Sequence, residues 1–325
     1  MVKEFRGRYQ VHESWADETA LDRRSLTLGA ALLISVAAAP IAEADDASTE
    51  ASDSQTHLTE VPLASGATLT IERRGPVALF GINRPHIQNR IDPETFRALA
   101  KACHDYDHDP SLRAAVLFGH GEHFSRGIDV DAFKAVVAAN QPWISSQGMI
   151  DPLGKRKPFL GKPLVVAVHG DTWNMADELF LVADLRVAAA NTNFGQDENT
   201  HGRFPGGGST IRFVREAGWG NAMRYMLTGD HWSAEEAYRM RTVQEVSPTP
   251  EAALQKATEL ADKIAACGPL GIKTTLASAH LAIDPAEAPA LAQLDAQFGA
   301  LFHTKDFQEG RDAEAQGRPP VYVGD

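Results

Sequence analysis

The sequence has 325 residues, of which 43% are hydrophobic and 23% charged, and this composition excludes a disordered chain, a collagen and a coiled coil. The formal net charge of −12 argues against nucleic acid or an anionic membrane surface as the main partner. Two cysteines, Cys103 and Cys267, are too few for a disulfide scaffold or a cysteine-based zinc site.

The first part of the chain has the features of an export signal. Arg23 and Arg24 precede the apolar run 28–39, and residues 42–44 read Ala-Glu-Ala, a pattern typical of a cleavage site. The apolar run is shorter than the roughly 20 residues that a membrane-spanning helix needs. Because the arginine pair resembles that of twin-arginine signals, we expect a signal peptide at 1–44, a disordered linker at 45–60 and a periplasmic protein with no membrane partner after cleavage. The alternatives are an amphipathic anchor or a misassigned start, which would leave the protein cytoplasmic.

Strand and helix signals alternate from there on. Short apolar runs predict buried strands at 77–82, 114–119, 164–168 and 185–190. Helices are predicted at 92–106, from about 129, at 174–183 and from the capping box 233–236. This alternation indicates an α/β core over residues 61–265. Residues 251–316 are almost wholly helical in pattern, so we expect a C-terminal helical region at 266–325 that serves in docking or oligomerisation.

Three other patterns do not predict a site. The run Gly206–Gly208 lacks the Lys-Ser/Thr of a phosphate-binding loop. His104 and His108 have a metal-ligand spacing, but they lie among aspartates at a helix end and predict a solvated face. No Gly-x-Ser-x-Gly motif of a serine hydrolase occurs. We therefore expect neither a metal nor a cofactor.

Several short motifs follow one another in a fixed order. They are Phe124-Ser-Arg-Gly-Ile-Asp-Val130, Val168-His-Gly170, Glu178-Leu179, Ala183-Asp-Leu-Arg186, Phe194-Gly-Gln-Asp-Glu198, Phe204-Pro-Gly-Gly-Gly208 and Leu227-Thr-Gly229. In order and spacing they resemble the motifs of the enoyl-CoA hydratase/isomerase (crotonase) superfamily, and the resemblance runs from about residue 68 to 323. It implies the crotonase (ClpP-like) spiral of ββα units with a C-terminal helical trimerisation region, assembled as a homotrimer or hexamer.

The resemblance also implies where the chemistry lies. A reaction through an enolate needs hydrogen-bond donors where the oxygen charge develops, and carboxyl groups to move protons. The two backbone N–H donors of the family fall on Ile128 and Met175, and its two glutamates fall on Glu178 and Glu198. We therefore expect an oxyanion hole formed by the first pair, and general acid/base catalysis by the second pair on an acyl-CoA or small-molecule carbonyl substrate.

The sequence departs from the family pattern at the usual glycine triplet and at the coenzyme A contacts. The triplet is replaced by Asn174-Met175-Ala176, and the Met175 side chain would crowd the place of a thioester. The late aromatic residue and lysine that commonly border the adenine are Glu314 and Gly317 here. These differences leave open whether coenzyme A is used.

Two alternative functions follow from these departures. A degraded triplet with an asparagine also occurs in the oxocamphor hydrolases, so a CoA-independent β-diketone carbon–carbon hydrolase is one alternative, and export favours it. In that reaction Glu198 or Asp177 would activate water, and His123 or His201 would carry a proton. The other alternative is a catalytically inactive crotonase-fold protein that serves in binding or assembly.

Overall fold

The computed structural model describes residues 66–139, 142–145 and 147–325. All of them belong to the second of two compact units, Thr59–Asp325. The predicted signal peptide 1–44 and linker 45–60 lie outside the described residues. Among the residues that are described, no helix combines the length and apolar character needed to cross a membrane.

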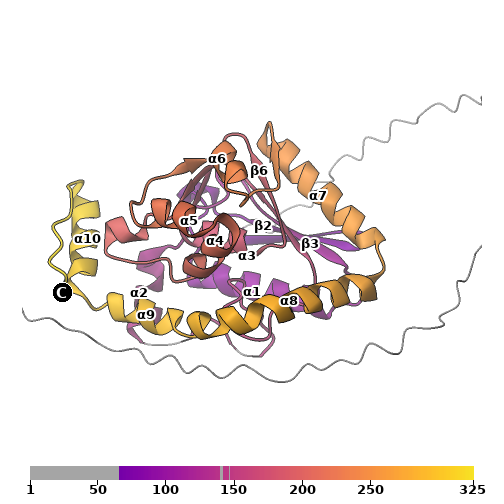
Figure 1. Ribbon diagram of the computed structural model, residues 1–325, viewed down its shortest axis with the longest axis horizontal. Helices are drawn as coiled ribbons and strands as arrows, with labels where there is room; N and C mark the ends of the chain where they lie inside the picture. The colour runs from indigo at the N-terminus through magenta and orange to yellow at the C-terminus, as the bar shows by residue number, and fades with distance from the viewer. Residues whose placement is uncertain (1–65, 140–141, 146) are drawn as a thin grey trace, which may run out of the picture. The chain divides into compact units, whose positions relative to one another are not determined.

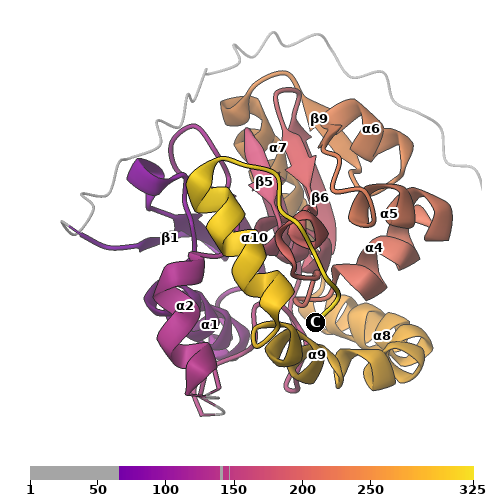
Figure 2. The ribbon, with the colours of Figure 1, turned by 90° about the vertical axis from the view of Figure 1, so that its left-hand side faces the viewer.

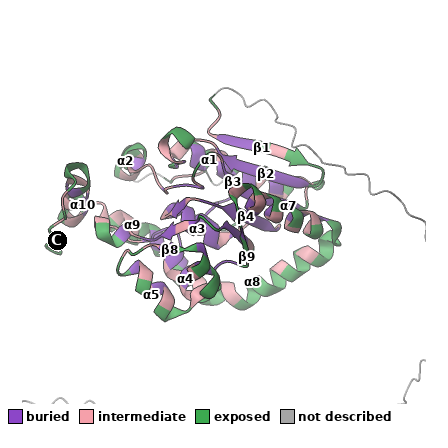
Figure 3. Cartoon of the chain, turned by 90° about the horizontal axis from the view of Figure 1, so that it is seen from above, coloured by how far each residue is buried: buried purple, intermediate pink, exposed green. Residues whose placement is uncertain are grey.

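A six-stranded sheet lies at the centre of this unit (Figure 1). In spatial order its strands are β1 (Leu69–Arg74), β2 (Val77–Ile82), β3 (Ala114–Gly119), β4 (Leu164–Val168), β6 (Leu185–Ala189) and β9 (Glu245–Ser247). β1 pairs with β2 in antiparallel orientation and the remaining pairs are parallel. β2, β3 and β4 are buried along their whole length (Figure 3). Continuous apolar runs predicted these strands because a parallel strand covered on both faces has no polar side.

Helices cover both faces of the large sheet. Helix α7 (Pro250–Ala266) packs on one face through a stripe of small residues, Ala253, Ala257, Ala261 and Ala265. Their spacing of four places them on one side of the helix. The other face carries α1 (Pro93–His108) and α3 (Met175–Val182).

A second, three-stranded sheet brings two strand ends together. It consists of β5 (Asp171–Trp173), β7 (Asn193–Gly195) and β8 (Trp232–Ser233). The units β4–β5–α3 and β6–β7–α4 (Ser209–Ala217) repeat the order of two strands and a helix that the sequence predicts. Because β5 and β7 pair in parallel, Trp173 lies opposite Gly195. The segments that follow them, α3 and the 3-10 helix η2 (Glu198–His201), therefore start side by side.

The two helix starts predicted from capping residues, at Asp92 and Ser233, are confirmed. The remaining elements are η1 (Pro85–Ile87), α2 (Val130–Ala138), α5 (Trp219–Met226) and α6 (Ala234–Arg239). Asp92 caps α1 and Asp129 caps α2 through their side chains. Ser233 accepts a hydrogen bond from the N–H of Glu236, but the Glu236 carboxylate pairs with Arg239 instead of returning to the cap. The predicted capping box is thus half formed.

The C-terminal helical pattern 251–316 is not one continuous helix. It divides into α7, α8 (Pro269–Leu291), α9 (Leu294–Leu301) and α10 (Lys305–Gln316). The first break falls at Gly268, because the residue before a proline favours extended backbone. Helix α8 buries only Leu291 and leaves Leu270 and Leu281 80% and 77% exposed (Figure 3). Exposed apolar residues can mark an interaction surface, and assembly through this region stays a prediction.

Helix α10 packs back onto the core near the predicted site (Figure 2). It contacts η2, and its Arg311 pairs with Asp131 of α2. A Cβ on Gly202, directly after η2, would lie 2.5 Å from the Asp306 carbonyl oxygen. The close approach therefore requires glycine, which fixes η2 against the C-terminal helix.

Candidate active site

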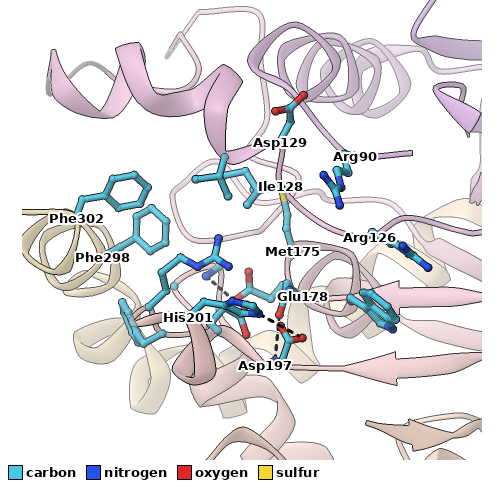
Figure 4. Close-up of a pocket in the computed structure, with 18 of the residues that line it drawn as sticks. Arg90, Arg126, Ile128, Asp129, Met175, Glu178, Asp197, His201, Phe298 and Phe302 are labelled. Carbon is cyan, nitrogen blue, oxygen red and sulfur yellow. Dashed lines mark hydrogen bonds and ion pairs between the residues drawn. The ribbon is translucent and has the colours of Figure 1, made fainter. Parts of the chain in front are cut away.

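A cavity of about 390 Å³ lies where the segments that follow the strands converge (Figure 4). Five residues predicted from the sequence line it together: Ile128, Met175, Glu178, Glu198 and His201. They come from the loop after β3, the start of α3 and the helix η2. The fold thus brings most of the predicted site residues into one enclosed space.

The two predicted backbone donors lie side by side in this cavity. Gly127 has a φ of +83°, and a Cβ there would lie 2.8 Å from the Trp173 oxygen and 3.3 Å from the Met175 nitrogen. Glycine therefore lets the loop that carries Ile128 reach the start of α3. Neither the Ile128 nor the Met175 N–H has an acceptor among the described residues. Met175 opens α3, so its N–H lies at the positive end of the helix dipole, and both donors can hold a substrate oxygen.

Glu178 is buried and held by backbone donors. Its Oε1 accepts hydrogen bonds from the N–H of Gly207 at 2.5 Å and of Ser209 at 3.5 Å. A Cβ on Gly207 would lie 2.2 Å from Oε2, so this approach requires glycine. Burial raises the pKa of Glu178, while the N–H of Gly207 and the charge of Lys155 act in the opposite direction. These partners favour the ionised carboxylate.

Glu198 has the opposite environment. It is the first residue of η2 and is also buried, and its Oε2 has no hydrogen-bond partner in the described part of the chain. Burial raises the pKa of Glu198 well above its usual range, and the negative charge of Glu178 raises it further. Two carboxyl groups in one cavity, one held by two backbone donors and one with an oxygen that has none, are suited to act as base and acid respectively.

Asp177 and His123 are not brought to the cavity. Neighbouring residues on a helix point about 100° apart, so Asp177 turns into the core where Glu178 faces the cavity. There Gln196 Nε2 donates to Asp177 Oδ2 at 2.9 Å. His123 Nδ1 accepts the N–H of Asp171 at 3.0 Å. The fold therefore does not bring these two side chains together with Glu178 and Glu198 in the cavity, and their action on water or protons stays a prediction.

The buried Asp177 leads to a stability prediction. Burial raises its pKa from 3.8 to about 8. An acid whose pKa is higher in the folded than in the unfolded state costs stability as the pH rises between the two values. We expect Asp177→Asn to raise the free energy of unfolding at about pH 9, by about 1.4 kcal/mol for each pKa unit removed, and to change little near pH 4.

Urea unfolding at the two pH values measures this effect. Asp262→Asn, which removes a half-exposed carboxyl group on α7, is the control and should show no such pH-dependent gain. Equal changes in the two variants would contradict the assignment of Asp177 as a buried neutral acid.

A comparison with family profiles shows which family the chain belongs to. The sequence profile described as Enoyl-CoA hydratase/isomerase matches residues 72–324. The chain belongs to this family. An enoyl-CoA hydratase of Mycobacterium tuberculosis is 35% identical over 261 residues, which are 79% of this chain and 97% of the relative.

Solved structures of other family members confirm the crotonase fold. A probable enoyl-CoA hydratase/isomerase from Mycobacterium abscessus superposes with a TM-score of 0.66 at 40% identity, over 80% of this chain and 99% of its own. A carnitinyl-CoA hydratase from Mycobacterium avium does so with a TM-score of 0.70 at 29% identity, over 79% and 99%. The predicted spiral of ββα units with C-terminal helices is thus confirmed.

This enoyl-CoA hydratase/isomerase family member has a charged cluster that the sequence reasoning missed. Asp197 Oδ2 lies 3.2 Å from His231 Nε2 and 3.8 Å from His201 Nε2 (Figure 4). Burial alone would raise the pKa of Asp197, but the contacts with the two histidines and Asn174 outweigh it and hold the pKa well below the ordinary range. Gly195 makes room for the His231 ring, because a Cβ there would lie 2.8 Å from it. The cluster places a negative charge beside Glu198.

The departures at the glycine triplet and the cysteines have simple structural outcomes. Met175 keeps its N–H, and its side chain forms part of the cavity wall between Ile128 and Glu178 (Figure 4).

Cys103 is buried and Cys267 exposed, and both thiols are free. Within the described ranges, no group of three or more His, Cys, Asp or Glu side chains is arranged to hold a metal ion.

Proposed function

We propose that this family member is a hydratase that adds water across the C2=C3 double bond of a trans-2-enoyl-CoA thioester. The observation that carries the proposal is one cavity lined by Glu178, Glu198, Ile128 and Met175, in which the N–H groups of the last two have no acceptor among the described residues. A reaction through an enolate needs this combination of donors and carboxyl groups. The hydratase names of the relatives support the same reaction.

In the proposed mechanism the thioester oxygen accepts hydrogen bonds from the Ile128 and Met175 N–H groups. The ionised Glu178 takes a proton from a water molecule as the water oxygen bonds to C3. The electron pair of the double bond moves onto the thioester, and the two N–H groups stabilise the resulting enolate oxygen. The neutral Glu198 then gives its proton to C2, which restores the carbonyl and yields a 3-hydroxyacyl thioester. Proton transfer from Glu178 to Glu198 through water resets the pair.

The protonation states follow from the contacts of each carboxyl group. The N–H of Gly207 donates to Glu178, and Lys155 adds a favourable charge, so Glu178 is the better base. Glu198 has an oxygen without a donor, and the charge of Glu178 opposes its ionisation. Hydrogen bonds to the charged form lower a pKa, whereas burial and like charges raise it. The contacts and burial of each carboxyl group therefore assign Glu178 as the base and Glu198 as the acid.

A pH profile of crotonyl-CoA hydration tests the proposal. We expect a bell-shaped dependence of kcat/KM on pH. Activity should fall as the pH drops through the raised pKa of Glu178, because the base becomes protonated, and also as the pH rises through the pKa of Glu198, because the acid loses its proton. Since the two groups interact, the apparent pKa values belong to the pair.

The outcome separates the proposal from its alternatives. In Glu198→Gln, the residual activity should lose its alkaline limb and keep its acidic limb. Loss of the enoyl absorbance at a rate equal to that without protein, at every pH, would contradict the hydratase proposal. That result would favour the CoA-independent hydrolase or the inactive binding protein.

A further inference from the structure

Arg203 is a cation in the cavity that has no ion-pair partner in the described part of the chain. It lies two residues after the end of η2, and its side chain lines the cavity. Its Nε is buried without a hydrogen-bond acceptor among the described residues, and none of their carboxylates lies within ion-pair distance of its guanidinium. A charge that leaves water without a partner is costly. The Arg203 guanidinium is therefore available to bind an anion.

The carboxylates that influence Arg203 are engaged elsewhere. Asp197 contacts two histidines, and Glu314 lies 3.9 Å from Arg311. Glu198 is the proposed neutral acid, which an ion pair with Arg203 would disable. Arg311 also faces this region and adds positive charge. A ligand that carries a carboxylate would give the Arg203 guanidinium a negatively charged partner, since a guanidinium binds a carboxylate through two parallel hydrogen bonds.

The position of Arg203 assigns this anion to one end of the substrate. Figure 4 shows Arg126 and Phe298 on opposite sides of Met175, whose N–H is a proposed oxyanion donor. Arg126 is 31% exposed, so the long polar part of a thioester can leave toward solvent on that side. Arg203 is followed by Phe204, whose ring lies 6.4 Å from that of Phe298. Arg203 therefore belongs to the end of the cavity that receives the acyl chain.

We propose that Arg203 binds a carboxylate at the far end of the acyl chain, so that the substrate is the mono-thioester of an unsaturated dicarboxylic acid. This inference rests on the proposed hydratase function and names its substrate class. Water adds to the C2=C3 bond as before, its oxygen to C3 and a proton to C2. The distal carboxylate takes no part in bond making and serves only to position the chain.

Matched pairs of enoyl-CoA thioesters test this inference. The two members of a pair have the same chain length, one ending in a methyl group and one in a carboxylate. We expect the wild-type protein to prefer the carboxylate in kcat/KM by about 10- to 100-fold, the range of a hydrogen-bonded charge pair. Arg203→Met should abolish this preference mainly through KM, and Arg203→Lys should restore part of it. Arg224→Gln, which removes an exposed arginine paired with Asp230, is the control and should keep it.

Other outcomes would overturn the inference without touching the hydratase proposal. If the ratio of kcat/KM for the two thioesters is the same in the wild type and in Arg203→Met, Arg203 does not bind the end of the acyl chain. If Arg203→Met weakens the binding of coenzyme A alone, measured by calorimetry, the anion is a phosphate of the coenzyme and not an acyl carboxylate.

A further measurement keeps the test valid where the wild type hydrates no thioester. Calorimetry then compares the binding of a saturated acyl-CoA ending in a carboxylate to the wild type and to Arg203→Met. Tighter binding by the wild type supports the subsite even though the hydratase proposal has failed. Equal binding contradicts the subsite.

Discussion

Glu198→Gln is expected to lower kcat for enoyl-CoA hydration by about 10²- to 10⁴-fold, the usual contribution of a positioned general acid. Glutamine keeps the size of the side chain but has no proton of suitable acidity to give to C2. Glu178→Gln should cause a loss of similar size because it removes the base that accepts the proton of water. KM should change little in both variants, since neither carboxyl group is proposed to bind the thioester. Steady-state assays of the purified variants measure both effects.

A control separates chemistry from folding in this pair. Glu235→Gln replaces an exposed glutamate on α6 and should keep the wild-type rate. Thermal unfolding should be unaltered or slightly improved in Glu198→Gln, since the change removes a buried acid whose charged form is disfavoured. A rate near that of the wild type in either glutamine variant at the catalytic positions would contradict the assigned roles.

Gly127→Ala is expected to lower kcat by about 10²- to 10³-fold, the cost of losing an oxyanion-hole donor. The added Cβ would lie 2.8 Å from the backbone oxygen of Trp173, so the loop must move away from α3. That movement separates the N–H groups of Ile128 and Met175, which must point at the same oxygen. The expected effect is thus on the chemical step, measured as kcat with a saturating thioester.

Gly75→Ala is the matched control for this substitution. Gly75 also has a positive φ, +55°, but a Cβ there meets no atom within 4 Å. Both alanines carry the backbone strain of a left-handed conformation, about 1–2 kcal/mol. Only the Cβ at position 127 also contacts the backbone of Trp173 and Met175 at the proposed oxyanion hole. Equal kcat values for the two variants would show that the Gly127 contact does not position the donors.

The central strands and the helix starts could be predicted because their signals are local. Continuous apolar runs mark β2, β3 and β4, and Asp92 and Asp129 mark two helix starts. The strands β5, β7 and β8 have two or three residues each, too few for a periodic pattern. They are defined by pairing with one another, which is a property of the fold.

Family motifs were enough to propose Glu178 and Glu198 as site residues, whereas the surroundings of these residues could not be predicted from the sequence. No local signal tells Asp177 from Glu178, and only the rotation of α3 sends one to the core and the other to the cavity. The cluster of Asp197 with His231 joins segments that are distant in sequence, and β7 pairing with β8 brings them together. Arg203 stands in a loop beside a motif and reads as an ordinary surface arginine until its burial is known.

The proposed hydratase reaction depends on the N–H groups of Ile128 and Met175, which are proposed to hold the thioester oxygen. Infrared difference spectroscopy of an unreactive acyl-CoA, labelled with carbon-13 at the thioester carbonyl, tests it directly. Binding should shift the carbonyl band to lower frequency in the wild type and in Glu198→Gln, and the shift should be largely lost in Gly127→Ala. A bound thioester whose carbonyl band is unshifted in the wild type would contradict it.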